Sequence, residues 1–131
     1  MKRCVATAMF LFFCVWSTAS HDVNAKPVPE CAISKSVIQG KASWYGPGFH
    51  GRKTANGEVY DMYGMTAAHK SLKLGTTVRV ENMSNGQVAI LRINDRGPYI
   101  EKRILDVSKR AAEVLGFRDD GLAPVRISVC G

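Results

Sequence analysis

The sequence predicts a mainly β fold, a small closed β-barrel with one inserted helix. Two observations point to this class. From residue 40 onward the chain divides into short apolar stretches separated by turn-forming residues, and a single stretch has the periodicity of a helix. Many short strands, many turns and one helix are typical of a small barrel.

Four strands are predicted where apolar and polar side chains alternate. They are KASWYG at 41–46, TTVRVEN at 76–82, QVAILRIND at 87–95 and VRISVC at 125–130. The segment SNGQ at 84–87 separates the second strand from the third, and tight hairpin turns favour the pair Asn-Gly. We therefore expect these two strands to form an antiparallel hairpin.

One helix is predicted from Ser108 to Leu115. Ser108 is a helix-capping residue, and Gly116 stands where the helix would end. The side expected to be buried carries Ala111, Ala112, Val114 and Leu115.

The first 25 residues have the pattern of a signal peptide. The basic start MKR is followed by an uncharged apolar run from Cys4 to Trp16 and then by small residues. This run is too short to span a membrane. Cleavage after Ala19, Ser20 or Ala25 would fit, and we favour Ala25 because Val23 and Ala25 match the small-residue pattern.

Cleavage after Ala25 would leave a lead-in segment at 26–39 and a barrel domain at 40–131. The alternative is a lipoprotein that is acylated at Cys14. Lipid attachment favours a small residue before the cysteine, and Phe13 stands there. We therefore expect a soluble secreted protein with no stable membrane insertion.

The mature chain would be basic. Removing Lys2, Arg3 and Asp22 from the 18 basic and 11 acidic residues leaves 16 and 10, a net charge of +6. A basic secreted domain is attracted to anionic polymers such as those of the cell wall. The charges form no single cluster and no nucleic-acid-binding motif occurs, so no nucleic-acid partner is expected.

Cleavage would also leave two cysteines, Cys31 and Cys130, one near each end of the mature chain. In an oxidising compartment this pair predicts a disulfide. Closing a loop of roughly 100 residues can stabilise a protein by up to about 4.7 kcal/mol. Metal binding is the weaker alternative because two distant cysteines and three scattered histidines lack ligand spacing, so no metal or cofactor is expected.

The carboxylate of Asp95 ends the most apolar predicted strand. Side chains two apart lie on one face of a strand, so we expect Asp95 to point the same way as Leu91 and Ile93, at the mouth of the core. The alternative is that Asp-Arg-Gly-Pro at 95–98 forms a turn, in which the aspartate bonds to its own main chain.

Two other polar candidates are Glu58, in TANGEVYDM, and His69, in TAAHKSL. Taken alone, Glu58 resembles a solvated loop carboxylate and His69 a structural histidine. The stretch from 44 to 63 is also rich in aromatic residues, which could stack on sugar rings or cover a small core. They are Trp44, Tyr45, Phe49, Tyr60 and Tyr63.

Three longer motifs carry a resemblance to a known family. They are GKASWYGPGFHGRKTANGEVYDM, MTAAHKSLKLGTTVRVEN and LRINDRGPYIEKRILDVSKRAAEVLG. In this order they resemble the rare lipoprotein A (RlpA-like) family of bacterial envelope proteins, which includes septal-type lytic transglycosylases. The resemblance implies a six-stranded double-psi β-barrel with one or two short helices, located in the periplasm.

The resemblance also implies an activity and roles for the polar residues. Active members cleave the glycan strands of peptidoglycan to 1,6-anhydro-muramyl products and prefer strands poor in stem peptides. Asp95 takes the position of the catalytic acid/base, Glu58 that of a second carboxylate, and His69 lies beside them. We expect the substrate to contact Trp44, Tyr45, Tyr60, Arg96 and Tyr99.

Two alternatives to an enzyme stay open. The first is a non-catalytic, expansin-like module that binds or loosens the wall. The second is a protein that uses the barrel only as a scaffold for interaction or regulation. In each case we expect a monomer.

Overall fold

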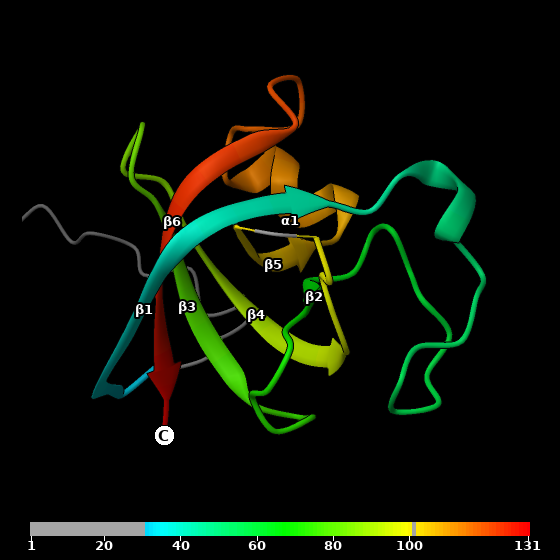
Figure 1. Ribbon diagram of the computed structural model, residues 1–131, viewed down its shortest axis with the longest axis horizontal. Coiled ribbons are helices and arrows are strands. Elements are labelled where there is room, and N and C mark those ends of the chain that lie inside the picture. The colour runs from blue at the N-terminus through cyan, green and yellow to red at the C-terminus, as the bar shows by residue number, and fades with distance from the viewer. Residues whose placement is uncertain (1–30, 101) are drawn as a thin grey trace, which may run out of the picture.

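The computed structural model describes residues 31–100 and 102–131. Figure 1 shows a closed barrel of curved strands with one short helix against its outer surface. The predicted fold class, a six-stranded barrel that is mainly β, is confirmed. In chain order the elements are β1 (Ile33–Trp44), the 3-10 turn η1 (Pro47–Phe49), β2 (Thr66–Ala68), β3 (Thr77–Asn82), β4 (Val88–Asp95), β5 (Arg103–Val107), α1 (Lys109–Val114) and β6 (Leu122–Cys130).

The strands close in the order β1-β5-β2-β4-β3-β6. The pairs β1/β5 and β2/β4 are parallel and the other four pairs are antiparallel. Because the barrel is closed, each of the six strands in the described part of the chain pairs with two neighbours. The interior is filled by alternate residues of the strands, as the inward-facing Val78, Val80, Leu91 and Ile93 show.

The expected hairpin and helix are both present. Strands β3 and β4 pair antiparallel, and Gly86 in their turn has a φ of 76°, a conformation that favours glycine. Helix α1 is capped by Ser108, whose hydroxyl oxygen accepts a hydrogen bond of 3.1 Å from the amide of Ala111. Ala111 is fully buried because α1 packs against the barrel.

Strand β1 begins at Ile33, inside the segment that the sequence suggested as a lead-in. It pairs with the last strand, and Ile33 lies opposite Cys130 in the register. The predicted disulfide joins Cys31 to Cys130 across a separation of 99 residues, with the two Cα atoms 4.8 Å apart. The disulfide therefore closes the amino-terminal strand against the carboxyl-terminal one.

The end of β4 carries an irregularity that positions the site. Opposite β2, Ile93 pairs with Ala67 and Asp95 with Ala68, so Asn94 is an extra residue in β4. Both Ile93 and Asn94 are buried, and the simple alternation ends there. The direction of Asp95 is therefore set by its contacts and not by its spacing from Leu91.

The predicted signal peptide and the possible lipid attachment at Cys14 lie outside the described residues. Within the described part of the chain, no helix has the length and apolar character needed to cross a membrane.

Candidate active site

The carboxylate of Asp95, half-buried at the end of β4, accepts three hydrogen bonds. The hydroxyl of Tyr45 donates to Oδ2 at 3.0 Å, and the amides of Ala55 and Arg96 donate to Oδ1 at 2.9 and 2.8 Å. Only the bond from Arg96 is the local contact that a turn would provide. The other two come from distant parts of the chain and hold the carboxylate in one orientation.

Tyr45 connects Asp95 to an aromatic cluster formed by the rings of Tyr45, Phe49 and Tyr60. It follows β1 directly, and its ring lies 4.7 Å from the ring of Tyr60 and 5.7 Å from that of Phe49, measured between centroids. Burial, together with the charge of Asp95, raises the pKa of the Tyr45 phenol well above its ordinary value of 10.0. The hydroxyl therefore keeps its proton and acts as a donor to Asp95.

Glu58 forms a two-point ion pair with Arg92 of β4. The two guanidinium nitrogens of Arg92 donate to its two oxygens at 2.6 and 2.7 Å, and Nδ2 of Asn94 donates at 3.3 Å. The hydrogen bonds from Arg92, and then that from Asn94, lower the pKa of Glu58 to about 2. Glu58 is thus an anion at neutral pH and is more than a solvated loop carboxylate.

The ion pair of Glu58 holds a small hairpin against the end of β4. In this hairpin Lys53 bridges to Val59, and the amide of Asn56 donates to the carbonyl of Asn94 at 3.3 Å. The hairpin also contains Ala55, whose amide reaches Asp95. Glu58 and Asp95 therefore belong to one contact between the hairpin and β4.

His69 contacts Asp95 through a hydrogen bond between their main chains. Its amide donates to the carbonyl of Asp95 at 3.2 Å, while its ring Nδ1 accepts from the amides of Ser71 and Leu72 at 3.1 and 3.0 Å. Burial, followed by the charges of Arg96 and Lys70, lowers the pKa of His69. The ring is neutral at neutral pH and shapes the loop after β2.

The guanidinium of Arg96 binds that same loop. It donates to the carbonyl of Leu72 at 2.6 Å and to the carbonyl of His69 at 3.2 Å. The sequence alone does not predict where the Arg96 side chain points. In the structure its guanidinium binds backbone carbonyls at the rim of the site.

A groove of about 310 Å³ runs beside Tyr45, between the end of β1, β5 and the segment 96–100. Four of the five predicted substrate contacts line it. They are Trp44, Tyr45, Arg96 and Tyr99. Asp95 does not line the groove itself, but its carboxylate accepts a hydrogen bond from Tyr45, which does.

Tyr60, the fifth predicted contact, does not line the groove. It is 3% exposed, its ring packs on Tyr45, and its hydroxyl accepts a bond of 3.4 Å from the amide of Lys109. The structure therefore places Tyr60 behind Tyr45, where it supports that ring from within the core.

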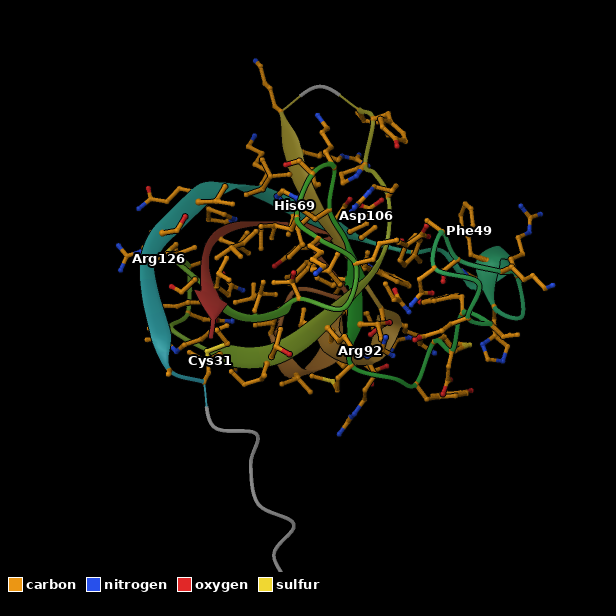
Figure 2. The ribbon with its side chains drawn as sticks, turned by 90° about the horizontal axis from the view of Figure 1, so that it is seen from below. Cys31, Phe49, His69, Arg92, Asp106 and Arg126 are labelled. Carbon is orange, nitrogen blue, oxygen red and sulfur yellow. A yellow bond between two sulfur atoms is a disulfide. The ribbon has the colours of Figure 1, made fainter. Side chains whose placement is uncertain are left out.

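The groove also includes Ser43, Arg103 and Asp106, which were not predicted from the sequence. Figure 2 shows Asp106 on the side of the barrel that carries the Phe49 loop, and both residues line the groove. The signal was present in the sequence, since Asp106 stands in the apolar stretch ILDV as Asp95 does in RIND. Among the described residues, no group of three or more His, Cys, Asp or Glu side chains could hold a metal ion.

The closed, mixed six-stranded barrel agrees with the double-psi β-barrel that the resemblance implied. Residues 37–127 match the family described as lytic transglycolase. The chain belongs to this family, as the resemblance to the RlpA-like proteins suggested.

Curated relatives agree with the family assignment. The chain is 51% identical over 112 residues to the endolytic peptidoglycan transglycosylase RlpA of Campylobacter jejuni, a match that covers 85% of this chain and 41% of the relative. It is 56% identical over 117 residues to the protein of the same name from Pseudomonas aeruginosa strain UCBPP-PA14, covering 82% of this chain and 34% of the relative. The chain thus spans well under half the length of these relatives.

Solved structures share the fold at low sequence identity. The Streptomyces papain inhibitor superposes with a TM-score of 0.61 at 19% identity, covering 78% of this chain and all of the inhibitor. The apo expansin of Clavibacter michiganensis superposes with a TM-score of 0.59 at 22% identity, covering 73% of this chain and 51% of the expansin. These similarities concern the barrel alone.

Proposed function

We propose that this protein is a lytic transglycosylase that cleaves the glycan strands of peptidoglycan and prefers strands poor in stem peptides. The observation that carries the proposal is the position of Asp95. Its carboxylate ends a barrel strand and is bound by the hydroxyl of Tyr45, whose residue lines an aromatic groove. Membership of the lytic transglycolase family supports the assignment of this groove to a glycan.

In this reaction one carboxyl group can act first as acid and then as base. Asp95 gives its proton to the glycosidic oxygen as the bond from that oxygen to C1 of the muramyl residue breaks. The C6 hydroxyl of the same residue then bonds to C1 and passes its proton to Asp95. The step yields a 1,6-anhydro product, consumes no water and restores the protonated carboxyl.

Glu58 and His69 act as positioning residues in this proposal. A carboxylate with a pKa of about 2 that is paired with Arg92 does not supply a proton at neutral pH. Its ion pair instead keeps the hairpin in place, so that the amide of Ala55 holds Asp95. His69 holds the loop after β2 through its ring nitrogen.

We also propose that the protein works as a monomer in the periplasm, without a membrane anchor. The disulfide between Cys31 and Cys130 supports an oxidising compartment. The intact mass of the secreted protein tests this, because cleavage after Ala25 gives a chain that starts at Lys26 and carries no lipid. A diacylglyceryl group on Cys14 would contradict the absence of an anchor, and light scattering tests the monomer.

Digestion of purified sacculi tests the activity. The wild-type protein should release soluble 1,6-anhydro fragments, and more of them from sacculi whose stem peptides an amidase has removed. An expansin-like module would sediment with both kinds of sacculi and release nothing. A scaffold protein would neither sediment with them nor cleave them.

A further inference from the structure

One positive charge in the lining of the groove is not paired with a negative one. Two cationic side chains line the groove, Arg96 and Arg103. The guanidinium of Arg96 is occupied by the carbonyls of His69 and Leu72. In the described part of the chain Arg103 forms no ion pair, and the single hydrogen bond of its guanidinium runs from Nη1 to the hydroxyl oxygen of Ser43 at 3.4 Å. Most donors of Arg103 are therefore available to a ligand in the groove.

An irregularity in β5 explains why Arg103 faces the groove. Two neighbouring residues of β1 pair with Arg103 and Leu105, so Ile104 is an extra residue in β5. In a regular strand, side chains an odd number of positions apart lie on opposite faces. The extra residue allows Arg103 to line the same groove as Asp106, at the other end of β5.

The carboxylate of Asp106 shares the groove with Arg103 but does not neutralise it. This carboxylate accepts a hydrogen bond from the hydroxyl of Ser43 and forms no ion pair with Arg103. Ser43 thus contacts both charged groups, and it anchors only Nη1 of the guanidinium. Within the described residues Nη2 and Nε have no partner, and such a free edge matches a planar carboxylate in a two-point contact.

Peptidoglycan strands present a carboxylate in one of their forms. Each muramyl residue carries a lactyl group, whose carboxyl is held in an uncharged amide when a stem peptide is attached. Removal of the peptide by an amidase leaves a free carboxylate in its place. We propose that Arg103 is a specificity-determining residue, which binds this free lactyl carboxylate and so selects strands without stem peptides. This inference rests on the proposed lytic transglycosylase activity for its substrate.

The competing explanation is that the groove only excludes the bulk of a stem peptide. Capping the free lactyl carboxylate as its methylamide separates the two, because the cap removes the charge and adds little bulk. Soluble, peptide-free strands are prepared, and one portion is coupled to methylamine with a carbodiimide. The kcat and KM for release of anhydro product are then measured on capped and uncapped strands.

We expect the wild type to have an about 10-fold lower kcat/KM on capped strands. The difference should appear in KM, because the lactyl group takes no part in the bond changes. Arg103→Gln should use both substrates alike, and Arg103→Lys should recover part of the difference because it keeps the charge without the two-point contact. The matched control is Lys102→Gln, which removes the same charge from an exposed neighbour outside the groove and should keep the wild-type preference.

Two kinetic results would overturn the role of Arg103 while the proposed function stands. The first is a wild type that cleaves capped and uncapped strands equally well, a result that needs no variant. The second is a folded Arg103→Gln protein that keeps the wild-type preference for uncapped strands. Thermal unfolding shows whether each variant is folded.

A third measurement serves if Arg103→Gln does not fold. The ¹⁵N signal of Arg103 Nε in the wild type should shift and saturate as uncapped strands are added. Saturation of the Trp44 ring signals with no change at Arg103 would contradict the contact.

Binding separates a failure of this inference from a failure of the proposed function. If the wild type cleaves no strand, the proposed function falls, and the affinities of Asp95→Asn for capped and uncapped strands are compared with and without Arg103→Gln. A preference for uncapped strands that disappears with Arg103→Gln would still support the carboxylate contact. Equal affinities for the two kinds of strand would overturn it.

Discussion

The hydroxyl of Tyr45 and the carboxylate of Asp95 form a hydrogen bond of 3.0 Å between residues that are 50 positions apart. The bond joins the end of β1 to the end of β4, so the closure of the barrel brings the two together. This hydrogen bond therefore links Tyr45, which lines the groove, to Asp95, the proposed acid/base.

Tyr45→Phe should lower the rate of anhydro-product release by about 10-fold. A hydrogen bond to a charged group contributes about 1.5–3 kcal/mol, and part of this energy is present in the ground state as well as in the transition state, so only the remainder changes the rate. The ring remains to pack on Tyr60 and Phe49, so thermal unfolding should change little. Turnover on stripped sacculi and a melting curve measure the two effects. Wild-type turnover in a folded Tyr45→Phe protein would show that this bond does not serve catalysis.

The ion pair of Glu58 predicts a dependence of stability on pH. Folding lowers the pKa of Glu58 from 4.5 to about 2, so the folded state favours the anion. The contribution of the pair to the free energy of unfolding is complete above pH 4.5 and is lost as the pH falls toward 2. Urea unfolding at several pH values should show this loss in the wild type and not in Glu58→Gln. Parallel curves for the two proteins would contradict the prediction, and Arg92→Gln is the control that removes the other partner.

His69 predicts a second pH effect near neutrality. Its pKa in the folded state is lowered below 6.5, so its contribution to stability is present above pH 6.5 and is lost as the pH falls through the lowered pKa. An NMR titration of the ring should have its midpoint below 6.5. A midpoint above that value would refute the buried, neutral ring.

Substitution of His69 distinguishes positioning from proton transfer. His69→Ala leaves the amides of Ser71 and Leu72 without their acceptor, which costs about 1–3 kcal/mol of stability and a partial loss of turnover. His69→Asn supplies an oxygen near the position of Nδ1 and should restore part of both. Unfolding and turnover are measured on the same samples, and no recovery in His69→Asn would favour a direct role for the ring.

The disulfide should stabilise the barrel without serving the site. Replacing both Cys31 and Cys130 by serine should lower the free energy of unfolding by about 2–4 kcal/mol, because the bond closes a loop of 99 residues. Figure 2 shows Cys31 on the side of the barrel away from the loop that contains Phe49 and the 3-10 turn η1. Turnover of the folded double variant at 25 °C should therefore match the wild type, and a large loss would show that the bond shapes the groove.

Local patterns were sufficient for part of the fold. The alternation in 76–95 predicted β3, β4 and their hairpin, and Ser108 with Gly116 predicted the bounds of α1 within a residue. Strands β2 and β5 had no such pattern, because Thr66–Ala68 has only three residues and Arg103–Val107 only five. The number of six strands came from the resemblance to a family, whereas the pairing of β2 and β5 is seen only in the structure.

The sequence predicted several of the residues that the structure brings together at the end of β4, but not the environment of each one. A carboxylate at the end of an apolar strand singles out Asp95, but its partners Tyr45 and Ala55 lie 50 and 40 positions away in the sequence. Tyr60 and Tyr45 look alike in sequence, and only the packing decides which of them is buried. Arg92 gave no signal as the partner of Glu58, since long-range ion pairs leave no local pattern.

Asp95→Asn tests the central claim most directly. Asparagine keeps the shape of the side chain and its acceptor oxygen but has no carboxyl proton to give. The variant should fold as the wild type does, bind peptide-stripped sacculi with unchanged affinity and release anhydro product about 10² to 10⁴ times more slowly. A folded Asp95→Asn protein that releases anhydro product at the wild-type rate would contradict the assignment of Asp95 as the acid/base.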